Sequence, residues 1–172
     1  MMFPYDQTLA VAQTCLCLHA QRAARALTRH FDEVFRALDL TSGQFSLMMA
    51  LNRPTPPTVG ELAPFLAMDR TTLTAQLKPL QRRGWVDVAA DRGDRRKRRV
   101  VLTAAGHALL HRAHPIWLQA HAALEQAVPT PDELRAQLMR LAAAPTPVNA
   151  APAGSSYPPD QHRPTPGAGK QP

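Results

Sequence analysis

The basic residues of this chain are concentrated in one segment, where they could bind a polyanion. The 172-residue sequence holds 20 Lys and Arg against 13 Asp and Glu, which gives a formal net charge of +7. Residues 69–112 contain 11 basic and four acidic residues, and the rest of the chain balances at nine against nine. Such a concentration of charge is typical of a surface that binds nucleic acid or an anionic membrane.

Two cysteines are candidates for redox chemistry. Cys15 and Cys17 are too few for a disulfide framework. On a helix Cys15 would share a face with His19 and Arg22, and cationic neighbours favour the reactive thiolate. The two cysteines are therefore redox-sensing candidates, or ligands for a soft metal or metalloid. The alternative is that both pack as small apolar residues in an interface.

Four histidines, at positions 107, 111, 114 and 121, fall on one face of an expected helix. A pair spaced i, i+4 can bind Zn or Ni if a third ligand converges on it. No acidic residue in that helix does so, and the histidine face lies about 130° from the apolar stripe. We therefore expect a solvated flank and assign no metal site.

Enzyme motifs are absent from the sequence. It contains no Gly-rich phosphate loop, no Gly-x-Ser-x-Gly and no His-Glu-x-x-His. We expect no catalytic residues, no cofactor and no enzymatic activity. An RNA-binding module is a less favoured alternative, because the basic segment has only Trp85 for stacking on bases. No apolar run is long enough to span a membrane, and the first residues, MMFPYDQ, do not show the basic stretch and apolar core of a signal peptide, so we expect no membrane partner and a cytoplasmic location.

Apolar spacing and capping residues predict the elements that position these side chains. A 3.6-residue period over residues 7–38 predicts one long amphipathic helix, longer than a small domain uses unless another chain covers part of it. Thr41 with Gln44 and Thr58 with Glu61 are predicted capping boxes of two short helices. Asp69 is the expected N-cap of a third helix that ends near residue 84, with a kink expected before Pro79.

A change of period then predicts a β-hairpin. Strands are expected at 85–88 and 99–102 around the basic loop 91–98. Helices are expected over 103–128, with a kink before Pro115, and from 131 to about 144. The Pro-rich tail from residue 145 is expected to be disordered.

Helix, tight turn, helix and basic hairpin together are typical of a winged helix-turn-helix domain. The fold class expected is mainly α, with a small β-hairpin wing and long N- and C-terminal dimerisation helices. In such a domain the second helix of the pair enters the major groove and the wing contacts the backbone or the minor groove. The expected DNA-binding residues are Arg70, Thr71, Thr72, Thr74, Gln76 and Lys78 of the recognition helix, and Arg92, Asp94, Arg95, Arg96, Lys97 and Arg98 of the wing.

The sequence resembles the MarR family of transcriptional regulators. Residues 91–106, DRGDRRKRRVVLTAAG, look like the wing signature of that family, in which Asp-x-x-Asp-Arg-Arg precedes a strand ending in Leu-Thr and a later Gly. Residues 40–51 and 68–86 are similar to its second helix and its recognition helix. The resemblance covers roughly residues 9–144. Ala75 stands where many members carry a basic residue, which is a departure from the pattern.

The resemblance implies a homodimer whose two lobes bind the half-sites of a pseudo-palindromic operator. In the family a wing Asp orients a neighbouring Arg and an Arg near the tip enters the minor groove, which maps onto Asp94 with Arg95 and Arg96. Members commonly respond to a small phenolic, aromatic or carboxylate-bearing effector, or to cysteine oxidation. The ligand-pocket candidates in this chain are His19, Arg25, Arg29 and His30.

The sequence therefore predicts four regions and one function. The regions are a dimerisation helix at 7–39, a DNA-binding domain at 40–102, C-terminal dimerisation helices at 103–144 and a disordered tail at 145–172. The function expected is a homodimeric transcriptional regulator that binds double-stranded DNA in a sequence-specific manner. It is expected to be a repressor that a small-molecule ligand releases from its operator. The alternative is a thiol-based redox or metal sensor that signals through Cys15 and Cys17.

Overall fold

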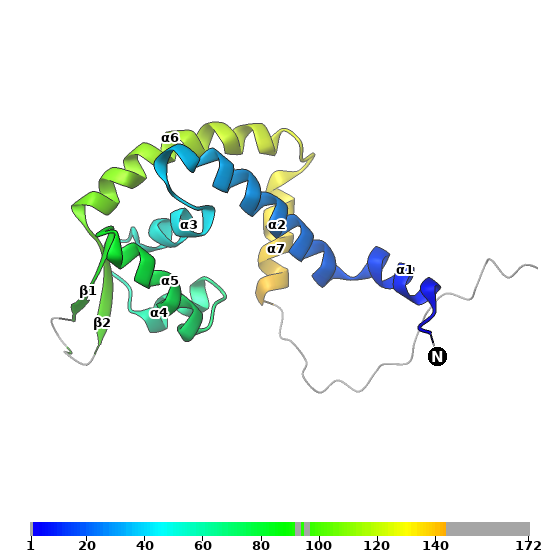
Figure 1. Cartoon of the computed structure of the whole chain (residues 1–172), viewed down its shortest axis with the longest axis horizontal. Helices are drawn as coiled ribbons and strands as arrows, with labels where there is room; N and C mark the ends of the chain where they lie inside the picture. The colour runs from blue at the N-terminus through cyan, green and yellow to red at the C-terminus, as the bar shows by residue number, and fades with distance from the viewer. Residues whose placement is uncertain (1, 92–93, 95–96, 144–172) are drawn as a thin grey trace, which may run out of the picture.

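The computed structural model describes residues 2–91, 94 and 97–143, and it confirms a mainly helical fold with one β-hairpin (Figure 1). The elements follow in the order α1 (Tyr5–Thr14), α2 (Leu16–Val34), the short 3₁₀ helix η1 (Arg36–Leu38), α3 (Ser42–Leu51), α4 (Val59–Phe65), α5 (Arg70–Arg82), β1 (Val86–Ala90), β2 (Arg98–Leu102), α6 (Ala104–Glu125) and α7 (Pro131–Ala143).

The predicted helix starts are confirmed. Thr41 and Thr58 each begin a capping box, with Gln44 and Glu61 completing the reciprocal hydrogen bonds. The Asp69 carboxylate accepts the Thr72 N–H at 2.8 Å and so caps α5. These side chains satisfy backbone N–H groups that have no partner inside the helix.

The prediction of one unbroken helix over residues 7–38 is wrong. Cys15 is extended, with φ −71° and ψ 104°, and separates α1 from α2. The Thr14 hydroxyl donates to the Ala10 carbonyl at 2.8 Å, and the Cys15 sulfur accepts the Leu18 N–H at 3.4 Å. These side-chain bonds offer the backbone an alternative to the helical pattern. Apolar periodicity continues across such a break, so it could not reveal it.

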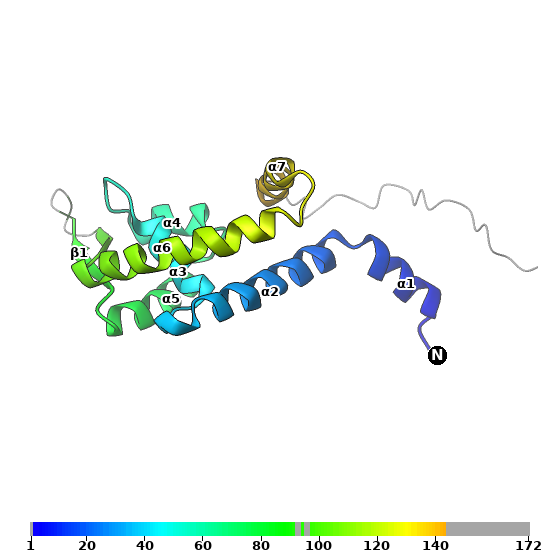
Figure 2. The same cartoon turned by 90° about the horizontal axis from the view of Figure 1, so that it is seen from above.

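The core lies in a lobe formed by α3, α4, α5, the hairpin and the adjoining parts of α2 and α6. Its largest fully buried side chains are Phe35, Leu47, Met48, Leu62, Leu73, Leu80 and Val100. By contrast α1, α2 and α7 contain no buried residue. Figure 2 shows α2 and α6 running away from the lobe, with α1 continuing beyond them. The long helices are therefore held by the lobe at one end only.

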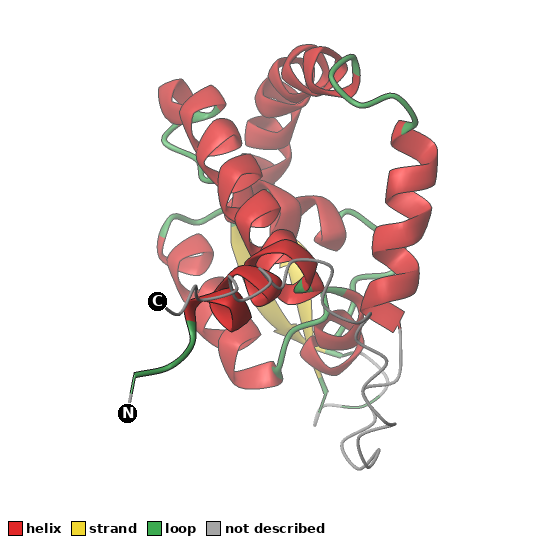
Figure 3. Cartoon of the chain, turned by 90° about the vertical axis from the view of Figure 1, so that its right-hand side faces the viewer, coloured by secondary structure: helices red, strands yellow, loops and turns green. Residues whose placement is uncertain are grey.

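The lobe positions α5 through a tight turn and a short sheet. Ala67 takes a left-handed conformation, with φ 51°, in the turn between α4 and α5. The Met68 N–H that follows it donates to the Ala63 carbonyl at 2.9 Å. After α5 the two strands, yellow in Figure 3, pair antiparallel with Val88 opposite Val100. Helices α5 and α6 each continue as a single helix through an internal proline, Pro79 and Pro115, and the kinks expected there stay predictions.

Within the described residues, no helix combines the length and the apolar character that crossing a membrane requires.

Candidate nucleic-acid interface

Helix α5 has one buried face and one exposed face. Leu73, Leu77 and Leu80 are buried against the lobe. The recognition-helix residues predicted to bind DNA are all exposed: Arg70, Thr71, Thr72, Thr74, Gln76 and Lys78. The apolar spacing of α5 therefore directs its polar side chains toward solvent.

Four of the predicted residues are brought together. Arg70, Thr71, Thr74 and Lys78 line one open hollow of about 340 Å³ with Ala75. A guanidinium lies toward one end of this surface and an ammonium toward the other, with hydroxyls between them. Arginine and lysine bind phosphates and guanine edges, while threonine offers a hydroxyl and a methyl group to a base.

Two of the three threonine hydroxyls of α5 already donate their protons inside the protein. Thr72 Oγ1 donates to Asp69 Oδ2 at 2.6 Å, and Thr74 Oγ1 donates to the Arg70 carbonyl at 2.7 Å. In these rotamers each oxygen still has lone pairs to accept a hydrogen bond. These two residues can therefore accept from the amino group of cytosine or adenine, or contact a thymine methyl through their own methyl group.

Arg70 is positioned by a glycine in the neighbouring helix. A Cβ built on Gly60 of α4 would lie 3.2 Å from Arg70 Nη2. The missing side chain leaves room for the guanidinium to lie against the start of α4. Arg70 thus reaches the N-terminal ends of both helices of the helix-turn-helix, which is where DNA approaches such a domain.

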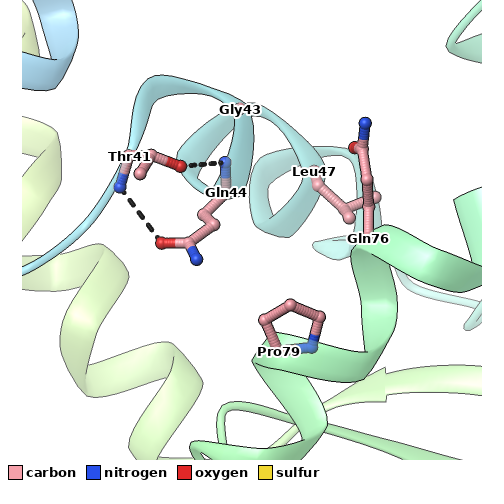
Figure 4. A pocket seen from close by; sticks show the side chains of 6 residues that line it. All are labelled: Thr41, Gly43, Gln44, Leu47, Gln76 and Pro79. Atoms are coloured by element: carbon pink, nitrogen blue, oxygen red, sulfur yellow. Dashed lines mark hydrogen bonds between the residues drawn. The ribbon is translucent and has the colours of Figure 1, made fainter.

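Gln76 belongs to a different part of the surface. It lines a hollow of about 260 Å³ between α3 and α5, with Thr41, Gly43, Gln44, Leu47 and Pro79 (Figure 4). In this view Gln76 stands beside Leu47, which lies between it and the capping box of Thr41 and Gln44. The structure therefore does not place Gln76 in the hollow shared by Arg70 and Thr74.

The hairpin presents basic residues beside this helix. Lys97 and Arg98 are exposed where β2 begins. Asp94 belongs to the wing turn, where its N–H donates to Asp91 Oδ1 at 2.9 Å and its carbonyl accepts the Lys97 N–H at 2.9 Å. The predicted contacts Arg92, Arg95 and Arg96 lie outside the described residues, and so does the expected pairing of Asp94 with a neighbouring arginine.

A second wing pair was missed by the sequence analysis. Arg99 forms an ion pair with Asp91, and their side chains are only 27% and 13% exposed. Arg99 Nη1 also donates to the Pro56 carbonyl at 2.6 Å, and the Val100 N–H donates to the Pro57 carbonyl at 2.9 Å. The base of the wing is thus bonded to the loop before α4. Among nine charged or glycine residues in a row, composition could not single out this pair.

Both acidic caps near the interface are stabilised as carboxylates. Hydrogen bonds from Thr58 lower the pKa of Glu61, and the charges of Arg99 and Lys97 add to that effect. Hydrogen bonds from the Thr72 hydroxyl and N–H lower the pKa of Asp69. The two helix starts that face the basic surface therefore keep their caps ionised at neutral pH.

Comparison with known proteins identifies this arrangement. The family model of the MarR family matches residues 40–97, the part of the chain from α3 to the wing. The M. tuberculosis transcriptional regulator MosR, solved in complex with DNA, is 35% identical with a TM-score of 0.69, over 75% of this chain and 94% of that one. The chain belongs to the MarR family.

Curated relatives agree with this assignment over a shorter span. The chain is similar to the transcriptional activatory protein BadR of Rhodopseudomonas palustris, with 35% identity over 88 residues, 49% of this chain and 50% of that protein. It is also similar to the transcriptional repressor NicR of Pseudomonas putida, with 35% identity over 107 residues, 62% of this chain and 65% of that protein. The chain thus matches about half to two thirds of the length of these MarR-like regulators.

The cysteines of this MarR-family chain lie at the helix break. Cys15 is half-buried and caps α2, whereas Cys17 is exposed and its sulfur accepts Gln21 Nε2 at 3.3 Å. The ring of His19 bonds to the Cys15 carbonyl oxygen at 2.8 Å. The predicted partnership of Cys15 and His19 therefore involves the backbone of Cys15, because the thiol is turned toward the Leu18 N–H.

The ligand-pocket candidates do not gather in one place. His19 lines a groove of about 410 Å³ between α2 and α7, with Leu16, Ala20, Ala23, Leu134, Gln137, Leu138 and Leu141. Arg25 donates to Gln21 Oε1 at 3.0 Å. His30 packs its ring edge-on against Phe31, and Arg29 is exposed. At 100° per residue, Arg25 and Arg29 also point to a different side of α2 from His19 and His30.

The histidines of α6 meet two environments, and His114 belongs to both, because its ring also stacks on Trp117 with the ring centres 6.1 Å apart. His107, His111 and His114 line a hollow of about 260 Å³ with Met49, Asn52 and Leu110. His121 packs its ring 4.5 Å from that of Trp117. Over residues 2–91, 94 and 97–143, no group of three or more His, Cys, Asp or Glu side chains is arranged to hold a metal ion.

Proposed function

We propose that this MarR-family chain is a homodimeric transcriptional regulator that binds double-stranded DNA in a sequence-specific manner and represses its target. The observation that supports this most directly is the exposed face of α5, where Arg70, Thr71, Thr74 and Lys78 share one hollow. Lys97 and Arg98 extend the same positive character along the wing.

In this proposal each residue of the interface has a distinct task. The N-terminal part of α5 enters the major groove, so Thr71 and Thr74 contact base edges and Arg70 reaches a guanine or a nearby phosphate. Lys78, two turns further along the helix, binds phosphate and fixes the register. Lys97 and Arg98 follow the backbone beside the wing.

The homodimer is supported by apolar surface on the long helices. Leu9, Leu16, Leu134, Leu138 and Leu141 are between 41% and 69% exposed. Leu16, Leu134, Leu138 and Leu141 also line the groove between α2 and α7, and an exposed apolar groove of this kind is typical of a protein–protein interface. A second copy of the chain would cover it and place two lobes on half-sites about one helical turn, roughly 34–36 Å, apart.

The same reasoning assigns regions of the chain. Residues 7–39 and 103–144 serve dimerisation, and residues 40–102 bind DNA. The predicted tail at 145–172 lies outside the described residues. A cytoplasmic location, with access to the DNA, is part of the proposal.

Release from DNA by a small-molecule ligand completes the proposed cycle. The groove between α2 and α7, which the partner would cover in the proposed dimer, has apolar walls and the imidazole of His19. A small aromatic ligand with an acidic group, held between the two copies, would fit this chemistry. Such a ligand would shift the protein only if it bound the DNA-free form more tightly than the DNA-bound form.

A second candidate function, thiol sensing, is favoured by the helix break. The Cys15 sulfur holds the first turn of α2, and exposed Cys17 is two residues away. Oxidation of the two thiols by hydrogen peroxide would form one S–S bond and release two molecules of water. Because the Cys15 sulfur would then bond to Cys17, the start of α2 would lose its present cap geometry.

The test is binding of a DNA fragment from upstream of the gene, measured by fluorescence anisotropy with reduced protein. We expect binding at least about 10³-fold tighter than to unrelated duplex at the same salt concentration. Lys78→Gln should weaken it, whereas Arg112→Gln, which removes an exposed charge on α6 in the same basic segment, should not. Equal affinity for duplex DNA and RNA would contradict the proposal.

Two additions to the same assay separate the modes of control. Peroxide that releases wild-type protein but not Cys15→Ser assigns thiol sensing, whereas release by salicylate or benzoate in both proteins supports ligand control. A reporter gene behind the same fragment should be expressed more strongly when the protein is deleted. Weaker expression after deletion would make the protein an activator, as BadR is described to be.

A further inference from the structure

Arg83 joins the end of the recognition helix α5 to the two long helices that leave the lobe. It is the C-cap residue of α5. Its guanidinium donates to the backbone carbonyl of Asp39 and forms an ion pair with the Asp39 carboxylate. The same guanidinium lies over the Trp85 ring, 4.4 Å from its centre. One side chain therefore has partners on both sides of α5 in the sequence.

Each partner of Arg83 is fixed to a different long helix. Asp39 ends η1, which continues from α2, and its N–H donates to the Arg36 carbonyl at 3.0 Å. The Trp85 carbonyl accepts the N–H of Thr103, the N-cap of α6, at 3.1 Å. Arg83 thus connects the C-terminal end of α5 with the end of α2 and the start of α6.

Arg83 lies at the opposite end of α5 from the residues proposed to read bases. Helix α5 has 13 residues, so at about 1.5 Å per residue its two ends are about 20 Å apart. That distance is far more than the depth of the major groove, about 8.5 Å. Although Arg83 belongs to the basic segment, Asp39 from outside that segment pairs with its charge.

The value of these contacts is geometric. The Asp39 side chain is 84% exposed and that of Arg83 is 33% exposed, and exposed ion pairs add little to the free energy of unfolding. A small change of angle would matter much more. A rotation of about 10° about the Arg83 end would move the far end of a roughly 20 Å helix by about 3.5 Å, close to the rise of one base pair.

We propose that Arg83 is a positioning residue that sets the angle of α5 against α2 and α6, and so determines the half-site spacing that the dimer accepts. The inference rests on the proposed function, since half-sites exist only for a dimer that binds duplex DNA. Arg83 itself touches no DNA. Its guanidinium acts through Asp39 and Trp85.

The test uses full-length protein and a duplex that wild-type protein selects from a randomised 30-base-pair library. Affinity is measured for that duplex and for versions with one base pair added or removed between the half-sites. Arg83→Gln should lose about three- to tenfold in affinity at the selected spacing, because α5 is then held at the required angle in only a fraction of the molecules. It should lose less at the altered spacings, so that the preference among spacings weakens.

Three further measurements separate positioning from DNA contact. The slope of log K against log salt should equal that of wild type, because no phosphate contact is lost. Asp39→Asn, which retains a residue type that tolerates a left-handed backbone, should give the same spacing profile. The double variant should be no worse than either single variant. Arg82→Gln, which removes the neighbouring exposed charge, should retain the wild-type spacing preference.

Three outcomes would overturn the inference. A salt slope lowered by about 0.9 with an unchanged spacing preference would make Arg83 a phosphate contact. Unchanged affinity and unchanged spacing preference in both Arg83→Gln and Asp39→Asn would show that the contact between Arg83 and Asp39 has no effect on DNA binding. A wild-type protein that selects no duplex would refute the proposed function itself, and the inference with it. Thermal melting of each variant shows whether it is folded, and Asp39→Asn tests the same contact if Arg83→Gln is not.

Discussion

Among the glycines described, Gly106 is the one where an added methyl group should destabilise the fold most. A Cβ built at this position would lie 2.1 Å from the Trp85 carbonyl oxygen and 3.1 Å from the Trp85 carbonyl carbon. Both atoms belong to the backbone, so no side chain can rotate away. Gly106 lies in the first turn of α6, where its N–H donates to Thr103 Oγ1 at 3.1 Å. Gly106→Ala must therefore push α6 away from the start of the hairpin by about 1 Å.

The size of the effect follows from three contributions. Overpacking costs about 1–3 kcal/mol. The bond from the Thr103 N–H to the Trp85 carbonyl, 3.1 Å long, must weaken, and a lost hydrogen bond adds about 0.5–1.5 kcal/mol. Alanine returns about 1 kcal/mol through its higher helix propensity. We expect a net loss of about 2 kcal/mol in the free energy of unfolding, a roughly 30-fold shift in the folding equilibrium.

The assay is equilibrium unfolding in urea, followed by circular dichroism, with Gly43→Ala as the matched control. A Cβ on Gly43, in the first turn of α3, would meet nothing within 4 Å, so that change should stabilise by about 0.4–1 kcal/mol. The free energy of unfolding should thus fall below wild type in Gly106→Ala and rise above it in Gly43→Ala, so that the two variants differ from each other by about 2–3 kcal/mol. If Gly106→Ala unfolds at the wild-type midpoint with the wild-type m-value, the steric reasoning is refuted.

Three further changes test other features. Hydrogen bonds from Thr72 lower the pKa of Asp69 in the folded protein. The ionised carboxylate therefore contributes its full stabilisation above the ordinary Asp pKa of 3.8, and this contribution is lost as pH falls through the folded-state pKa. Asp69→Asn should make the melting temperature fall less steeply over that acidic range. Leu138→Glu should break the proposed dimer, and sedimentation velocity would contradict this by showing an unchanged species. Arg99→Gln should speed hydrogen exchange at the Val100 N–H, which bonds to the Pro57 carbonyl, relative to Arg98→Gln; equal exchange rates would mean that Arg99 does not anchor the wing.

Local signals predicted the lobe well. Threonine and aspartate caps lie next to the helices that they begin, so spacing alone identified the starts of α3, α4 and α5. The hairpin was predicted within two residues of its bounds because a change of period and a charged loop mark it. Long-range contacts were not visible in the same way. Arg83 meets Asp39 across 44 positions, and no local pattern links them.

The sequence predicted which residues could contact DNA, and the structure shows which of them lie together. The DNA-binding side chains of α5 were predicted as the polar residues of the second helix of a helix-turn-helix, but the separation of Gln76 from Thr74 depends on the position of α3. The break at Cys15 arises from hydrogen bonds by Thr14 and Cys15. Neither residue is a glycine or proline, so the usual markers of a helix end were missing.

The turn between α4 and α5 contains a left-handed residue that is not glycine, Ala67. For a residue with a Cβ, the left-handed conformation is a narrow energy minimum about 1–2 kcal/mol above the right-handed helical conformation. Glycine can adopt a much wider range of backbone angles there. The turn thus holds a small amount of strain, balanced by the Met68 bond to the Ala63 carbonyl. Because alanine restricts the backbone of this turn more than glycine would, we expect the crossing angle of α4 and α5 to vary little. If α5 binds DNA as proposed, less conformational entropy would then be lost at this joint on binding.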